Sequence, residues 1–318
     1  MYESRLVNAV MALVLKMFGA FCRMLPRRVN LGFGRRLGMW VYHLSGRRRD
    51  IALNNLKNAY GDEISQARKL ELAKGSFVNF GTGLTEFFTF PSIDEEWLDE
   101  MMDISGAENL GTAAAEGNGV LFLTLHLGMW ELIPVALISL GYSVSIVAKT
   151  ARTASANNVL TELRGNTGIT VLSGSGSMGG ILRQLKSSGL VGFVLDQNAL
   201  PKDGVFVPFF GRLACTLSSL AVIARRTGAP VVPVYTHRVG NRHKLVIEKP
   251  ITTPDTPERE DDILNRTTAY SEWTEKAVRL HPEQWLWLHD RWRTRPVDES
   301  DDLVPSSRFQ VPGQEDNT

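Results

Sequence analysis

The residues best suited to chemistry are a histidine and a glutamate five positions apart. His126 follows an apolar run at residues 120–125, and Glu131 comes where a helical pattern begins. If His126 ends a strand and Glu131 lies in the first helical turn, the carboxylate can reach back to one imidazole nitrogen. The other nitrogen then faces the cleft as a general base with a fixed tautomer. A hydrogen bond of purely structural value is the alternative interpretation.

Metal chemistry is not expected from this pair. Zinc-protease helices carry two histidines four residues apart with a glutamate between them, and no second histidine follows His126 at that spacing. The two cysteines, Cys22 and Cys215, are too few for a disulfide framework or a cysteine-rich zinc site, which favours a reducing, cytoplasm-facing environment. Four other histidines lack an acid or cysteine at metal spacing: His43, His237, His243 and His281.

The elements that would position the pair belong to a pattern of alternating strands and helices. Up to about residue 90 the spacing is helical, with helices predicted at 30–44, 47–61 and 65–88. Farther along, short apolar runs predict strands at 119–125, 142–148, 168–172, 190–196, 229–235 and 244–249. Segments with helical spacing separate them, at 129–140, 155–165, 178–188 and 217–226. The sequence therefore predicts an α/β fold with a mostly parallel sheet flanked by helices, and ligands at the strand ends.

The N-terminal segment combines apolar and basic residues. Residues 6–26 are the most apolar stretch, interrupted by Lys16 and Arg23, which share one face of a helix. Residues 1–60 hold eleven basic and two acidic residues, although the whole chain has 35 Lys and Arg against 34 Asp and Glu. The two charges argue against a spanning helix or a signal peptide, so we expect a helix that lies in, or barely crosses, an anionic membrane. A docked core helix is the alternative. Nucleic acid is not expected, because no aromatic residues are interleaved with the arginines.

A glycine motif supports a rival interpretation. Gly174, Gly176 and Gly179 have the spacing of the dinucleotide-binding fingerprint and lie between a predicted strand and a predicted helix, with Asp196 twenty residues past Gly176. Glycine and serine turns before helices are also common for capping alone. A dinucleotide-binding enzyme is therefore kept as a distant alternative.

Five blocks of sequence resemble those of one enzyme family. They are HLGMWE at 126–131, RGNTG at 164–168, the run at 190–216, RRTGAPVVPVY at 225–235 and PEQWLWLHDRWRTRP at 282–296. From about Arg48 to Pro296 the chain resembles the bacterial lipid A biosynthesis acyltransferases, the lauroyl and myristoyl late acyltransferases. In that superfamily the H-x-x-x-x-D/E pair takes a proton from an acceptor hydroxyl, which attacks the thioester of an acyl carrier. Relatives that acylate glycerol phosphate carry an F-P-E-G-T-R block. This chain has FFGR at 209–212 instead, which points to a glycolipid acceptor.

The resemblance implies a glycerol-phosphate-acyltransferase-like fold and a membrane-associated O-acyltransferase of lipopolysaccharide biosynthesis. The enzyme would sit at the cytoplasmic side of the inner membrane and move a fatty acyl chain from acyl carrier protein to a hydroxyl of a lipid A precursor, without a cofactor or metal. Acyl-CoA as donor, or another glycolipid as acceptor, is the alternative. A lipid-binding protein that has lost catalysis is a further alternative. The intact His126 and Glu131 argue against it.

Roles for other residues follow from the same resemblance. His126 is the base and Glu131 its orienting partner. Arg152 and Arg164 would bind acceptor phosphates or the phosphopantetheine arm of the carrier, or else form salt bridges on a solvated helix. Two residues close an apolar strand, Asp196 and Gln197. They are assigned to substrate binding, and support of a loop is the alternative. Three aromatic residues are expected to line the acyl groove or the core: Phe206, Phe209 and Phe210.

The predicted organisation has three parts. Residues 1–26 form the membrane-associated helix, and residues 27–296 form the acyltransferase domain, helical over 27–90 with an α/β core over 106–296. Residues 297–318, rich in Asp, Glu, Ser and Pro, form a loose acidic tail. The tryptophans and arginines of 282–296 are expected to lock a terminal helix onto the sheet, or to bring Arg291 or Arg295 to the substrate.

Overall fold

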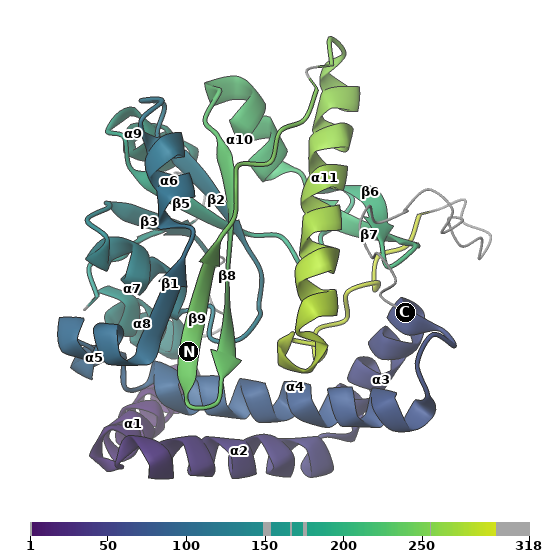
Figure 1. The fold of residues 1–318 in the computed structure, drawn as a ribbon. Coiled ribbons are helices and arrows are strands. Elements are labelled where there is room, and N and C mark those ends of the chain that lie inside the picture. Colours follow the sequence, from purple (N-terminus) through teal and green to yellow (C-terminus); the bar gives the residue numbers. More distant parts are fainter. Residues whose placement is uncertain (1, 149–153, 166, 174–176, 255, 297–318) are drawn as a thin grey trace, which may run out of the picture.

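A seven-stranded sheet organises the protein, whose computed structural model describes residues 2–148, 154–165, 167–173, 177–254 and 256–296 (Figure 1). Its strands are β1 (Met102–Ser105), β2 (Val120–Thr124), β3 (Val144–Val147), β4 (Thr170–Leu172), β5 (Leu190–Val194), β8 (Val231–Val239) and β9 (Arg242–Ile247). Their order is β1-β9-β8-β2-β5-β3-β4, and all neighbours are parallel except β8 and β9. The predicted α/β fold with a mostly parallel sheet is confirmed.

Both faces of the sheet are covered, which explains why the central strands are apolar throughout. Side chains of β2 alternate between two clusters, with Leu121 and Leu123 on one face and Val120 and Phe122 on the other. One face packs against α9 (Ser177–Lys186), α10 (Ser219–Thr227) and α11 (Arg259–Leu280). The other face packs against α6 (Ala107–Ala114), α7 (Leu132–Ser139) and α8 (Ala154–Gly165). A short helix, α5 (Glu95–Met101), leads into β1.

The N-terminal third is helical, as predicted, and lies along one edge of the α/β core (Figure 1). It consists of α1 (Tyr2–Met24), α2 (Arg27–Leu44), α3 (Gly46–Tyr60) and α4 (Gln66–Phe87). Helices α2 and α4 approach so closely that a Cβ on Gly38 would lie 2.1 Å from the carbonyl oxygen of Phe77. A Cβ on Gly81 would lie 2.5 Å from the oxygen of Gly34. Glycines are therefore needed at this seam, which fixes α2 to the core.

Several elements differ from those predicted. The edge strand β1 was not expected, nor was the separate antiparallel hairpin of β6 (Gly204–Phe209) and β7 (Arg212–Leu217). The segment after α11 is irregular apart from a 3-10 turn at Pro282–Gln284, so the expected terminal helix is wrong. A second 3-10 turn, Phe90–Ser92, follows α4. The acidic tail predicted at 297–318 lies outside the described residues.

Candidate active site

The candidate catalytic histidine is bonded to an aspartate from the neighbouring strand. Strands β2 and β5 are parallel, with Thr124 paired to Val194, so the residues two positions beyond each strand emerge side by side. These residues are His126 and Asp196. Nδ1 of His126 lies 2.8 Å from Oδ1 of Asp196, and the backbone N–H of His126 donates to Oδ2 at 2.8 Å.

The chain after α11 holds this pair from the other side. The indole Nε1 of Trp285 donates to Oδ2 of Asp196 at 2.7 Å. Leu286 donates its backbone N–H to the carbonyl of His126 at 3.1 Å, and Leu127 and Trp285 form an antiparallel bridge. Both carboxylate oxygens of Asp196 are thus occupied, which fixes the side chain and, through it, the imidazole.

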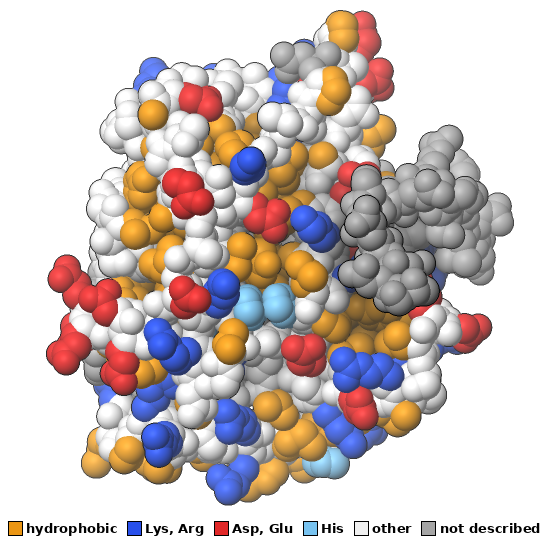
Figure 2. Space-filling model, in the orientation of Figure 1, with side chains coloured by type: hydrophobic (Ala, Val, Ile, Leu, Met, Phe, Trp, Pro, Cys, Tyr) orange, Lys and Arg blue, Asp and Glu red, His pale blue; other side chains and the backbone are white. Residues whose placement is uncertain are grey.

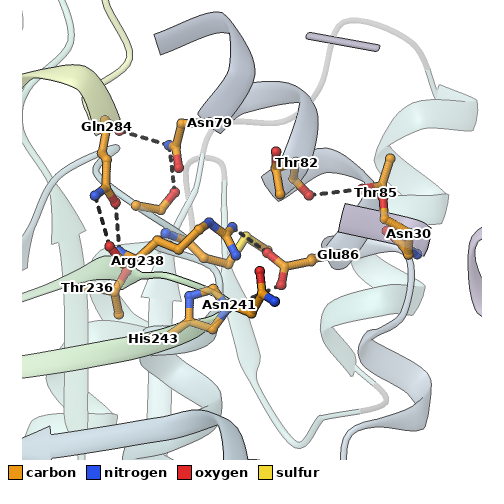
Figure 3. A network of polar contacts seen from close by, with 12 residues as sticks. Asn30, Asn79, Thr82, Thr85, Glu86, Thr236, Arg238, Asn241, His243 and Gln284 are labelled. Carbon is orange, nitrogen blue, oxygen red and sulfur yellow. Dashed lines mark hydrogen bonds and ion pairs between the residues drawn. The ribbon is translucent and has the colours of Figure 1, made fainter. Parts of the chain in front are cut away.

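A tight turn after His126 makes this contact possible. Gly128 has φ +59°, and a Cβ there would lie 2.3 Å from the carbonyl oxygen of Thr236, so a glycine is required. The backbone N–H of Gly128 donates to the carbonyl of Gln284 at 3.2 Å. The amide of Asn79 on α4 donates to the carbonyls of Gly128 and Gln284 at 3.0 and 2.9 Å (Figure 3). The loop that follows His126 is therefore fixed by helix α4 and by the C-terminal segment together.

The expected partnership of His126 with Glu131 is wrong in its geometry. Glu131 directly precedes α7 and forms a bidentate pair with Arg164, with Arg164 Nε to Oε2 at 3.0 Å and Nη2 to Oε1 at 2.5 Å. The imidazole Nδ1 is instead bonded to Asp196. Residues 126–131 form bends and turns rather than a strand end followed by a helical turn, so the carboxylate does not fold back as predicted. Glu131 still acts on His126 through its charge.

Electrostatics make His126 a better base than an isolated imidazole. Burial would lower the pKa of His126, but the charge of Asp196 and the hydrogen bond to it raise that pKa above its usual value, with a smaller contribution from Glu131. Burial would raise the pKa of Asp196, yet the bonds from His126 and Trp285 hold it below its usual value. Asp196 therefore remains a carboxylate, and Nδ1 of His126 is the protonated nitrogen facing it.

The second imidazole nitrogen faces polar and aromatic side chains. Nε2 of His126 lies 3.2 Å from Nε2 of Gln197, and the ring of Trp130 contacts the imidazole edge to face with centroids 4.9 Å apart. His126 keeps 19% of its side chain exposed, against 2% for Asp196. A hydroxyl that replaces the Gln197 amide at Nε2 would meet an unprotonated nitrogen backed by a carboxylate, which is the arrangement of a general base.

Nearby groups in the C-terminal segment support the site through hydrogen bonds to backbone atoms. Nε2 of His289 accepts the backbone N–H of Asn198 at 3.0 Å, and burial lowers the pKa of His289 to about 4. The buried guanidinium of Arg291 donates to the carbonyl of Cys215 at 2.8 Å and lies 5.1 Å from the ring centroid of Phe209. The substrate role considered for Arg291 is thus replaced by a structural one. Arg295 donates to the carbonyl of Leu213 at 2.6 Å.

The other predicted site residues do not all lie at His126. Gln197 lies at the candidate base, whereas Arg152 falls outside the described residues. Phe209 is fully buried against Trp285 and Trp292. Phe210 is also buried, and it packs against Tyr60 and Trp287. Phe206 on β6 is half-buried. In this structure Phe209 and Phe210 belong to an aromatic core behind Asp196, and the predicted acyl groove stays a prediction.

Two observations bear on the rival sequence interpretations. Gly174 and Gly176 of the dinucleotide fingerprint lie outside the described residues, and Gly179 lies in helix α9. Asp196, the acid that would bind a ribose in that interpretation, has both oxygens committed to His126 and Trp285. No group of three or more His, Cys, Asp or Glu suited to a metal ion occurs among the described residues.

Sequence reasoning missed the roles of Trp285 and of the loop contacts from α4. The block at 282–296 resembles the family, but its pattern gives no sign that an indole would reach an aspartate 89 positions earlier. A usable signal for Asp196 did exist: His126 and Asp196 each come directly after an apolar run, at 120–125 and 190–195. Parallel pairing of those two strands would have placed them together.

Comparisons with known proteins identify the family of the chain. The family model for bacterial lipid A biosynthesis acyltransferases matches residues 3–294. The chain belongs to this family. It is 29% identical over 291 residues to the lipid A biosynthesis palmitoleoyltransferase of Escherichia coli K12, covering 87% of this chain and 89% of that protein.

Two further relatives are less similar. The lipid A biosynthesis lauroyltransferase of Escherichia coli K12 is 26% identical, with 86% of this chain and 88% of that protein covered. A phosphatidylinositol mannoside acyltransferase of Mycolicibacterium smegmatis is 23% identical, covering 70% of this chain and 72% of that protein. The protein is therefore an acyltransferase, and the predicted resemblance is confirmed.

Proposed function

We propose that this acyltransferase moves a fatty acyl chain from a thioester to a hydroxyl of a lipid A precursor in lipopolysaccharide biosynthesis. The observation that carries the proposal is the His126–Asp196 pair, which leaves Nε2 of a histidine with a raised pKa at the surface of the site. The names of the relatives support a lipid A precursor, and the mycobacterial relative makes another glycolipid the second candidate acceptor.

The chemistry needs one base and no covalent enzyme intermediate. Nε2 of His126 takes the proton from the acceptor hydroxyl, whose oxygen attacks the thioester carbonyl. The tetrahedral intermediate collapses as the carbon–sulfur bond breaks, and the imidazolium returns the proton to the departing thiolate. Asp196 stabilises the transient positive charge on the ring. Gln197, displaced from Nε2 by the hydroxyl, is the neighbouring donor for the carbonyl oxygen as it gains negative charge.

Acyl carrier protein is the proposed donor, with acyl-CoA as the alternative. Both present the acyl group on a phosphopantetheine arm, so the reacting atoms are the same. Basic residues suit the phosphate groups of either partner. The resemblance assigns Arg152 and Arg164 to phosphate binding. Because Arg164 is already bonded to Glu131, its function in the proposal is to hold that carboxylate near His126. The chemistry as proposed requires no metal or cofactor.

The N-terminal helices are proposed to bind the membrane by lying in its surface. None of the described helices is both long and apolar enough to cross a bilayer. Helix α1 instead exposes a broad apolar face that includes Leu13 at 59%, Met17 at 64% and Met24 at 82%. Basic and apolar side chains are interspersed along the lower edge of the molecule, where α1 and α2 lie (Figure 2). This combination is typical of interfacial helices on anionic membranes.

Mass spectrometry of lipid A tests the reaction. Expression in a bacterium that lacks its own late acyltransferases should add one fatty acyl chain to lipid A. The His126→Ala variant, expressed at the same level, should add none. Purified protein given acyl carrier protein or CoA thioesters of the same chain then identifies the donor. Unchanged lipid A together with acylation of a different glycolipid would contradict the lipid A proposal and support the second acceptor.

Vesicle sedimentation tests the interfacial placement. Replacing Leu13 and Met17 by Gln removes two exposed apolar side chains, each worth about 1.5–3 kcal/mol if buried in the membrane. Binding to anionic vesicles at high salt should fall at least tenfold. Leu280→Gln, which changes an apolar side chain of 55% exposure on α11, is the matched control and should bind normally. Equal binding by all three proteins would rule out insertion of α1.

A further inference from the structure

A small cavity lies at the elbow between α1 and α2, away from His126. It has a volume of about 130 Å³, and its lining includes Arg23, Arg27, Glu86 and Trp97. The elbow is held closed by the amide of Asn30, which donates to the carbonyl of Cys22 at 2.8 Å. This cavity therefore has a defined shape set by two helices and by the buried end of α4.

The cavity carries more positive than negative charge. The carboxylate of Glu86 lies 2.5 Å from Nη2 of Arg238 and 3.3 Å from Nη2 of Arg27, so one acid faces two guanidinium groups. Glu100 adds a second, more distant negative charge near Arg27. Arg23 adds a third guanidinium, and its Nη1 donates to a neutral acceptor, the carbonyl of Phe88, at 3.1 Å. Three cations against two anions leave an excess positive charge beside the cavity.

Arg27 also has hydrogen-bonding capacity to spare. Its Nη2 donates to the carbonyl of Asn241 at 2.6 Å, but its Nε and Nη1 are shielded from solvent and have no hydrogen-bond partner. The guanidinium lies 5.5 Å from the ring centroid of Trp97. Burial, and then the charge of Arg238, lower the pKa of Arg27 despite Glu86. An anion in the cavity would offset the crowded positive charge, and a small shift of the Arg27 side chain toward it would give these shielded donors an acceptor.

The surrounding network keeps these groups in place before any ligand binds. His243 Nε2 lies 3.2 Å from Glu86, and the backbone N–H of Arg238 donates to Oε1 of Gln284 at 2.7 Å (Figure 3). Arg35 on α2 donates to the side chain of Asn241 at 3.2 Å. Because the β8–β9 hairpin, α2 and α4 are tied together around Glu86, a ligand would not have to order them.

We propose that this cavity binds a phosphoryl group carried by a membrane lipid. A guanidinium with two spare N–H groups suits phosphate oxygens, and the unpartnered Oδ1 of Asn30 can accept the P–OH of a singly protonated phosphate monoester. The lipid is favoured as the source because exposed apolar residues flank the elbow, namely Phe21, Met24 and Val29. The lipid source rests on the interfacial placement proposed above, whereas the phosphoryl site itself does not.

Calorimetric titration of the full-length protein tests the site with two soluble probes, dioctanoyl phosphatidate and inorganic phosphate. Wild-type protein should bind the short-chain phosphatidate. Arg23→Gln should weaken this binding about tenfold, the equivalent of one charge-assisted hydrogen bond. Arg27→Gln should have at least the same effect. The matched control is Arg28→Gln, since Arg28 is exposed at the same elbow but does not line the cavity; its affinity should stay within about twofold of the wild type.

Each outcome is decisive. Equal weakening in Arg28→Gln and Arg23→Gln would mean nonspecific attraction and overturn the site. No binding of either probe by the wild-type protein would also overturn it. Binding of inorganic phosphate as tight as that of phosphatidate would keep a phosphoryl site but overturn the lipid source. If Arg27→Gln fails to fold, Arg23→Gln carries the test, because its exposed side chain bonds only a carbonyl among the described contacts. Both probes are soluble, so failure here leaves the vesicle test of α1 independent.

Discussion

Two buried carboxylates in this protein each bond a histidine, yet they lie beside histidines whose pKa values shift in opposite directions. Asp196 contacts His126, whose pKa is raised, and Glu86 contacts His243, whose pKa is lowered. Burial disfavours the charged imidazole in both cases. The difference lies in the other partners of the two carboxylates.

Asp196 receives its remaining hydrogen bonds from uncharged donors, the backbone N–H of His126 and the indole of Trp285. Its negative charge is therefore available to the imidazole. Glu86 is instead paired with Arg238 and approached by Arg27, and both cations also repel a charged His243. In this protein the buried acid raises the pKa of its histidine where its other hydrogen bonds come from uncharged donors, and not where two guanidinium groups lie against it.

The largest effect on activity is expected from removing the charge of Asp196, the carboxylate bonded to His126. Asp196→Asn keeps the shape of the side chain but removes the charge and the fixed acceptor for Nδ1 of His126. Acyl transfer should fall by about a hundred- to ten-thousand-fold, as for loss of a positioned base. Asp262→Asn is the matched control, because Asp262 is equally buried but pairs with Arg225 and Arg266 at the start of α11. Specific activity per folded molecule should survive in that control.

Removing the charge of Glu86, the other carboxylate, should reduce stability more than turnover. Glu86→Gln leaves two guanidinium groups near an uncharged amide, and breaking a buried pair costs about 3 kcal/mol. Chemical denaturation at pH 7 measures this loss. Glu63→Gln, which removes an exposed partner of Arg279, should change the free energy of unfolding by less than about 1 kcal/mol.

The same variant should alter the acid sensitivity of the fold. Burial would raise the pKa of Glu86, but Arg238 and His243 hold it well below its usual value. The stabilisation it provides is therefore complete above a pH of about 4.5 and is lost as the pH falls. Glu86→Gln should flatten the acid side of the stability curve. An unchanged curve would mean that other carboxylates dominate acid unfolding.

A smaller effect is expected from the donor that holds Asp196. Trp285→Phe removes the indole N–H but keeps most of the aromatic packing, and a hydrogen bond to a charged group is worth about 1.5–3 kcal/mol. Turnover should drop about tenfold. Trp292→Phe is the control, since Trp292 also packs on Phe209 while its Nε1 has no hydrogen-bond partner. Similar losses in both variants would show that packing, not the hydrogen bond, is what matters.

The least change is expected from removing Glu131 and Arg164 together. Their charges act on His126 with opposite sign, and they are bonded to one another. The double variant Glu131→Gln/Arg164→Gln should therefore lose no more activity than either single variant. Strictly multiplicative losses would show that the two residues act separately, for example with one of them binding substrate directly.

The sequence predicted the strands that position this site, but not the hydrogen bonds within it. Apolar runs at 120–125 and 190–196 located two central strands, and their ends located His126 and Asp196. Which acid would bond the imidazole depended on the pairing of β2 with β5 and on a turn that keeps Glu131 away from the ring. Periodicity along a single segment carries no information about such contacts between distant segments. For the same reason the role of Trp285 was not visible.

The most direct test of the account is the pH dependence of kcat/KM for acyl transfer by the wild-type protein and Asp196→Asn. The base must be unprotonated, so the wild-type rate should rise with pH through an inflection above the ordinary histidine value of 6.5. In Asp196→Asn burial acts without the opposing carboxylate, so the residual activity should rise through an inflection below that of the wild type. An inflection unchanged in Asp196→Asn but lowered in Glu131→Gln would contradict the assignment of Asp196 as the partner of the base.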